Sequence, residues 1–157
     1  MNLFNIENAF ERNKARGWPT TYFAIDIHDT IFKGAYKLDN PGKTFYPWAK
    51  EVLLNLTNNP GVSIILYTAS HHGPARDVER WLYEHGIRIL DINHNPDHRS
   101  NELCDFSKKF HFDVLLDDKG GFEGWHDWFL IMHELKRIGQ WVDEPKATES
   151  KKSLTKN

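Results

Sequence analysis

Carboxylates stand directly after two apolar segments of this sequence. Asp26 follows the segment TYFAI, and Asp117 and Asp118 follow the segment FDVLL. Two or three carboxylates brought together raise one another's pKa unless a cation lies between them. Mg²⁺ is the simplest such cation, and it is usually bound by one or two carboxylates together with waters and a phosphate. The pattern therefore predicts a Mg²⁺ site wherever the two segments end side by side.

Groups suited to phosphate chemistry accompany these carboxylates. A carboxylate such as Asp26 can attack phosphorus and form an acyl-phosphate. The hydroxyl of Thr68 or Ser70, backbone N–H groups of a loop and a lysine would then bind the remaining phosphate oxygens. Lys108 and Lys109 precede the second acidic segment, and either could reach the same place.

The elements that must position these groups alternate along the chain. Apolar runs predict strands over residues 21–27, 61–68, 87–92 and 111–118. Helical periodicity, with Pro, Gly and Ser at the ends, predicts helices over residues 5–17, 48–59, 73–86, 101–110 and 125–141. In the fourth of these helices, Ser100 is the expected N-cap and Cys104 is expected to be buried.

This alternation is typical of a parallel sheet with helices on both faces. We therefore predict an α/β fold, a three-layer α/β/α Rossmann-like sandwich with a mostly parallel central sheet. Residues 1–142 are expected to form a single domain, and the polar residues 143–157 a disordered tail. Ligands bind such sheets beyond the carboxyl ends of their strands, which is where the predicted strands carry their polar groups.

Four motifs in this order resemble those of the haloacid dehalogenase superfamily of aspartate-nucleophile phosphatases. AIDIHDTI resembles the strand followed by Asp-x-Asp-x-Thr, with one change, and IILYTAS resembles the strand ending in Thr or Ser. FSKKF resembles the lysine motif, and FDVLLDD the strand ending in an Asp pair. The resemblance covers residues 20–138 and leaves no room for a sizeable inserted cap domain. It is closest to the small capless members, which include phosphatase domains that remove 3′-phosphates from nucleic acid ends.

The resemblance implies a role for each matching residue. Asp26 would be the nucleophile and a Mg²⁺ ligand, and the backbone carbonyl of His28 would be another ligand. Asp117 would bind the metal, and Asp118 would bind it directly or through water. The groups expected to bind the phosphorylated substrate are Thr30, Thr68, Ala69, Ser70 and Lys109. Lys108 is the alternative to Lys109, and Ser70 is equally suited to cap the following helix.

The sequence departs from the superfamily at His28, where Asp is usual and acts as general acid and then general base. Histidine can do both near neutral pH. Asp29 either replaces the missing acid or holds the imidazole. The alternative is a catalytically weakened protein that binds a phosphorylated ligand or a partner, and non-phosphate chemistry at the same nucleophile is a third option.

The remaining histidines and tryptophans are expected to have other roles. His94 and His98 are interpreted as solvated residues or substrate contacts, because helical geometry between them is doubtful. Trp125, Trp128 and Trp141 are expected to pack the last helix onto the sheet.

Composition restricts the partners of the 157-residue chain. Its 20 Lys and Arg against 22 Asp and Glu argue against a strongly basic nucleic-acid surface or a polybasic membrane patch. No apolar stretch is long enough to span a bilayer, and Cys104 is the only cysteine, which fits a reducing compartment. We therefore expect a cytoplasmic protein that acts, with Mg²⁺, on a phosphorylated small molecule, a nucleotide or a 3′-phosphorylated nucleic acid end.

Overall fold

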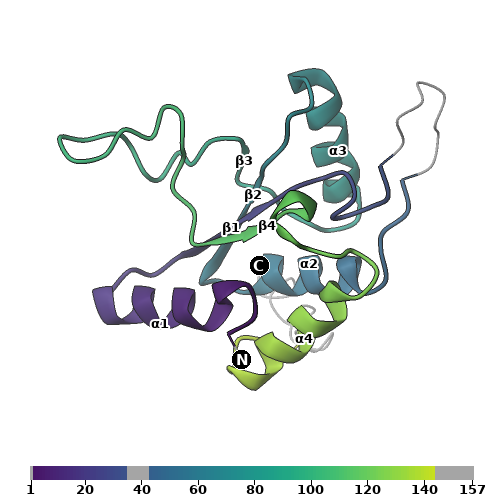
Figure 1. Ribbon diagram of the computed structural model, residues 1–157, viewed down its shortest axis with the longest axis horizontal. Coiled ribbons are helices and arrows are strands. Elements are labelled where there is room, and N and C mark those ends of the chain that lie inside the picture. Colours follow the sequence, from purple (N-terminus) through teal and green to yellow (C-terminus); the bar gives the residue numbers. More distant parts are fainter. Residues whose placement is uncertain (1, 35–42, 144–157) are drawn as a thin grey trace, which may run out of the picture.

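The computed structural model describes residues 2–34 and 43–143, and a four-stranded sheet lies at its centre (Figure 1). The strands are β1 (Thr21–Ile25), β2 (Val62–Leu66), β3 (Asp91–Ile92) and β4 (Val114–Leu116). Their order across the sheet is β3-β2-β1-β4, and every neighbouring pair is parallel. The predicted α/β class with a parallel sheet is confirmed. Apart from Asp143, the expected tail over 143–157 lies outside the described residues.

β1 is the strand on which the others depend, because it pairs with both β2 and β4. All five of its residues are buried, as its continuous apolar run predicts for a strand covered on both faces. Phe23 and Ile25 point into a large core on one face. Tyr22 and Ala24 point into a smaller core on the other face.

Four helices pack against the large core: α1 (Ile6–Arg16), α2 (Ala49–Asn58), α3 (His72–Glu84) and α4 (Asp127–Arg137). Each contributes buried side chains to the same cluster, among them Ile6, Leu53, Leu82 and Trp128. Figure 1 shows α1, α2 and α4 below the sheet. The connections β1–α2–β2 and β2–α3–β3 cross the sheet in the same direction, so right-handed crossovers place α2 and α3 on one face.

The opposite face of the sheet is covered by residues 93–113, which we call the cover segment. It returns the chain from β3 to β4 and buries Phe110 against Tyr22, Ala24 and Ile65. In Figure 1 it extends to the upper left. The architecture is consistent with a three-layer sandwich in which this segment forms the third layer.

The helix predicted over residues 101–110 is wrong, because the chain takes turns and bends there. The Ser100 hydroxyl accepts the backbone N–H of Phe106 at 2.8 Å. The Asn101 side chain accepts the N–H groups of Leu103 and Cys104 at 2.8 and 2.9 Å. Such side-chain bonds compete with helical ones and keep the backbone irregular. Cys104, expected to be buried, is exposed.

The other elements form where they are predicted, although several are shorter. Only the last two residues of the predicted strand 87–92 pair with β2. The short helices η1 (Leu3–Asn5) and η2 (Asp118–Gly120) add single turns. Trp128 is fully buried on α4 and Trp141 packs against the core, as predicted, whereas Trp125 is 57% exposed. Within the described residues, no helix has the length and apolar character needed to cross a membrane.

Two stacked histidines of the cover segment pack against Tyr22 of β1. The rings of His98 and His111 are 4.0 Å apart and nearly parallel. Nε2 of His111 is buried, finds no hydrogen-bond partner among the described residues and lies 3.6 Å from a carboxylate oxygen of Asp113. Burial lowers the pKa of His111, and positive charge on His98 and Arg16 lowers it further, while Asp113 opposes the shift. The folded protein therefore favours the neutral His111 imidazole.

We expect this pair to make the protein less stable in mild acid. Because the unfolded chain takes up the His111 proton more readily, this contribution to stability is complete above about pH 6.5 and is lost as the pH falls below that value. His111→Phe, which keeps a stacking ring, should reduce the loss of unfolding free energy between about pH 7.5 and 5.5. Urea denaturation at several pH values measures how the unfolding free energy depends on pH, and His133→Phe at an exposed position is the control. An unchanged pH dependence in His111→Phe would contradict the assignment.

Candidate functional site

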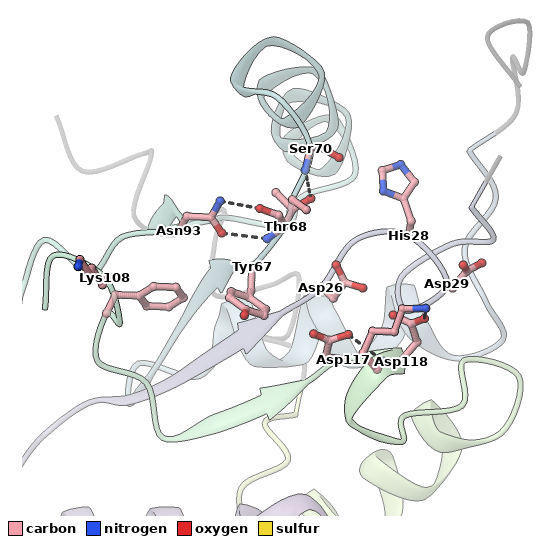
Figure 2. Close-up of a pocket in the computed structure, with 13 residues that line it drawn as sticks. Asp26, His28, Asp29, Tyr67, Thr68, Ser70, Asn93, Lys108, Asp117 and Asp118 are labelled. Carbon is pink, nitrogen blue, oxygen red and sulfur yellow. Dashed lines mark hydrogen bonds and ion pairs between the residues drawn. The ribbon is translucent and has the colours of Figure 1, made fainter. Parts of the chain in front are cut away.

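A cavity of about 490 Å³ opens at the carboxyl edge of the sheet, where β1, β2 and β4 end. Figure 2 shows the predicted acidic residues on one side of it and Thr68 and Ser70 on another. Every predicted site residue except Thr30 and Lys109 lines this cavity. The lining residues are Asp26, His28, Asp29, Tyr67, Thr68, Ala69, Ser70, Asn93, Lys108, Phe110, Asp117, Asp118 and Lys119.

Three carboxylates meet on the acidic side, as the sequence predicts. Asp26 follows β1, and its backbone N–H donates to the carbonyl of Leu116 at 2.9 Å. Since Ile25 pairs with Leu116, the residues that follow both strands emerge side by side. One carboxylate oxygen from each of Asp26, Asp117 and Asp118 lies within 4.8 Å of the others. Such a cluster can bind a metal.

The cluster changes the acidity of Asp26, raising its pKa to about 7. Burial is the largest cause, followed by a hydrogen bond with Asp118 and the negative charges of Asp117 and Asp118. A cation bound between these carboxylates would oppose this rise in the pKa of Asp26. Hard oxygen donors with excess negative charge form a donor set that suits Mg²⁺.

Thr30 lies behind the carboxylates rather than in the cavity, and it is fully buried. Its hydroxyl lies 3.4 Å from Oδ2 of Asp26, to which it donates, and accepts the backbone N–H of Asp118 at 3.2 Å. Its carbonyl accepts the indole N–H of Trp128 at 2.7 Å. Thr30 does not line the cavity, and its expected contact with substrate stays a prediction. What the structure shows is that Thr30 contacts the acidic residues Asp26 and Asp118.

The turn after β1 brings His28 and Asp29 to the cavity. Asp29 has a left-handed backbone (φ 59°), its N–H donates to the carbonyl of Phe32 at 2.7 Å, and its carboxylate accepts the N–H of Gly34 at 2.9 Å. The His28 ring packs edge-on against Phe32, with centroids 5.5 Å apart. Figure 2 shows His28 above and to the right of Asp26, and both residues line the cavity.

The chain beyond β2 is held by a residue that the sequence did not single out. The side-chain amide of Asn93 accepts the backbone N–H of Thr68 at 2.9 Å and donates to its carbonyl at 2.7 Å. These bonds continue the link between the two chain segments beyond the paired strands, and Asn93 has a left-handed backbone (φ 52°), which asparagine tolerates. The only feature of the sequence that could have indicated this role is that an asparagine directly follows a predicted strand.

Thr68 and its neighbours face the cavity as predicted. The Thr68 hydroxyl accepts the N–H of Ser70 at 3.0 Å and, within the described residues, donates no hydrogen bond of its own. The capping alternative for Ser70 is wrong, because His71 stands at the N-cap of α3 and no side chain caps that helix. Ala69 and Ser70 line the cavity instead.

The structure separates the two candidate lysines. Lys108 lines the cavity, whereas Lys109 lines a different one beside Cys104. Figure 2 shows Lys108 on the far side of Tyr67 from Asp118. Lys119, which the sequence analysis did not select, lies closer to the acidic cluster, with its Nζ 3.8 Å from a carboxylate oxygen of Asp118. Lysines thus stand at both ends of the cavity.

Comparison with known proteins shows the fold alone. No protein-family model and no curated protein matches the chain. The solved structure of a conserved protein from Bacteroides thetaiotaomicron is similar, with 24% sequence identity and a TM-score of 0.57. The similarity covers 75% of this chain and 91% of that one. The likeness to the haloacid dehalogenase superfamily therefore depends on the sequence motifs and the site geometry.

The raised pKa predicts that Asp26 destabilises the metal-free protein at neutral pH. Because the folded state binds the Asp26 proton more tightly than the unfolded state, its contribution to stability is complete below about pH 4 and is lost as the pH rises towards 7. In EDTA at pH 8, Asp26→Asn should therefore be more stable than wild type by about 1–3 kcal/mol, after allowance for solvent screening. Near pH 4 this gain in stability should disappear.

Urea denaturation at the two pH values tests this prediction. Mg²⁺ should raise the unfolding free energy of the wild type at pH 8 and have less effect on Asp26→Asn. The exposed Asp77→Asn on α3 is the matched control. An Asp26→Asn protein less stable than wild type at pH 8 without metal would contradict the electrostatic argument.

Thr30→Val should destabilise the protein by about 1–3 kcal/mol, since it keeps the shape but leaves the N–H of Asp118 without its partner. Thr30→Ser retains the hydroxyl and should lose less. Thermal and chemical denaturation measure both variants. If valine and threonine proved equally stable at this position, the hydroxyl would not be holding the acidic residues.

Proposed function

We propose that the protein is a Mg²⁺-dependent phosphatase, a phosphoric monoester hydrolase that forms an aspartyl-phosphate at Asp26. The observation that carries the proposal is the meeting of three carboxylates from two strand ends within 4.8 Å at the edge of a cavity. The order of the four sequence motifs supports it, because each motif ends at this edge or in the segment that borders it.

The residues present fit a bound Mg²⁺. Asp26, Asp117 and Asp118 would hold it with their carboxylates, and the backbone carbonyl of His28 would add a fourth oxygen. The ion would neutralise charge on the phosphate oxygens and keep Asp26 ionised at neutral pH.

Side chains and backbone groups of the protein carry out the phosphoryl transfer and the proton transfers. A carboxylate oxygen of Asp26 forms a bond to phosphorus while the ester O–P bond breaks, and the departing oxygen takes a proton from the His28 imidazolium. A water then attacks phosphorus and gives a proton to the neutral imidazole, which releases phosphate and regenerates the Asp26 carboxylate. The Thr68 hydroxyl and the Ala69 N–H donate to the phosphoryl oxygens.

Phosphate release from an aryl phosphate, with and without Mg²⁺ over about pH 5–9, tests the proposal. Asp26→Asn should lower kcat by about 10³-fold or more, since it removes the nucleophile. Asp77→Asn should not. In acid-quenched wild-type reactions, mass spectrometry should find a phosphoryl group on the peptide that contains Asp26. Full activity in Asp26→Asn would exclude the nucleophile assignment.

The second candidate function is binding of a phosphorylated ligand with little turnover, and His28 in place of the usual acid is the observation that favours it. Two variants separate the candidates. If His28 is the acid, His28→Gln should lower kcat by about 10²–10⁴-fold. An inactive wild type that gains activity through His28→Asp would instead support the weakened protein.

A further inference from the structure

Two aromatic side chains, Tyr67 and Phe110, form one wall of the cavity, and we call them the aromatic wall. Tyr67 directly follows β2, and its backbone N–H donates to the carbonyl of Ile25 at 2.9 Å. The centroids of the two rings are 6.0 Å apart. Phe110 is 7% exposed, whereas Tyr67 is 40% exposed. The wall therefore has a fixed inner ring and an accessible outer ring.

Tyr67 lies on the covered face of the sheet and is still partly exposed. Strand alternation puts it on the sheet face covered by Phe110, which is anchored in the small core with Tyr22 and Ala24. The cover segment thus supports one side of the Tyr67 ring and leaves the rest open to the cavity. Within residues 2–34 and 43–143, the Tyr67 hydroxyl makes no hydrogen bond. A large aromatic side chain at a cavity wall, with an unused hydroxyl, is suited to contact a ligand.

The wall lies between two charged regions. Figure 2 shows Tyr67 between the acidic residues and Lys108. Across the part of the chain that the structure describes, Lys108 forms no ion pair. A phosphate monoester bound through its phosphate at Asp26 would lay its leaving group along the wall towards this lysine. A flat leaving group would stack there, and the ammonium of Lys108 could donate to ring acceptors that nucleobases carry.

We propose that Tyr67 determines substrate specificity and that the substrate is a nucleoside monophosphate whose base stacks on the aromatic wall. This inference depends on the proposed phosphatase and narrows its substrate class. A sugar phosphate without a base would bind the acidic end of the cavity and leave the wall empty. The base should therefore improve kcat/KM over that of the matching sugar phosphate.

The test compares adenosine 5′- and 3′-monophosphates with ribose 5-phosphate, which lacks the base, in the presence of Mg²⁺. We expect the preferred nucleotide to exceed ribose 5-phosphate in kcat/KM by about 10-fold or more. Tyr67→Leu, which removes the ring but keeps an apolar side chain, should lower this ratio about 10-fold, while Tyr67→Phe should keep most of it. Tyr83→Leu on α3, a 70% exposed tyrosine outside the cavity, is the matched control and should leave the ratio unchanged.

The outcomes distinguish this inference from the proposed function. Phosphate release that is equal for nucleotides and ribose 5-phosphate, or a ratio that Tyr67→Leu does not change, would overturn the specificity and leave the phosphatase standing. If no substrate releases phosphate, the proposed phosphatase function is rejected. The binding affinities of the same ligands, measured by calorimetry with Mg²⁺, then test the inference about the aromatic wall. Binding of a nucleotide more tightly than ribose 5-phosphate, and weakened in Tyr67→Leu, would support the aromatic wall. Equal binding of both ligands would exclude it.

Discussion

The hydrogen bonds of Thr30 hold the candidate site together. Its hydroxyl contacts the carboxylate of Asp26 and the backbone of Asp118, and its carbonyl accepts the indole N–H of Trp128. One buried residue thereby joins the turn after β1, the end of β4 and helix α4. Because Thr30 is fully buried, a polar group left without its partner there would be costly. The positions of the acidic side chains follow from this network and from the pairing of β1 with β4.

Those positions are electrostatically unfavourable without a cation. The pKa of Asp26 is raised to about 7 because burial and the charges of its neighbours oppose ionisation. Sites that perform chemistry often keep such unfavourable arrangements, which the rest of the fold must offset. Here the offset comes from the large core, where four helices bury one face of the sheet.

The cover segment connects the fold to the site on the opposite face. Its irregular backbone carries Asn93, Lys108 and Phe110 to the cavity, as loops on a rigid scaffold commonly do. It is fastened to the sheet by Phe110 and by two contacts of Tyr22, whose hydroxyl donates to Asp97 at 2.9 Å and whose N–H donates to Asp113 at 2.8 Å. Any change that loosens this segment therefore alters the cavity wall as well as the stability.

Local patterns were enough to predict the α/β class and the meeting of Asp26 with Asp117 and Asp118, because parallel strands end at a common edge and these residues follow two such strands. The helix over 101–110 was wrong, since side-chain bonds of Ser100 and Asn101 compete with helical bonds that periodicity alone does not weigh. The hydrogen bonds of Asn93 with Thr68, and the contact of Tyr67 with Phe110, each join residues 25 or more positions apart in the chain. The position of Lys108 at the cavity likewise depends on the path of the cover segment. Such contacts arise only when the cover segment folds back over the sheet, so tertiary packing, rather than residue spacing, fixes the shape of the cavity around the acidic cluster.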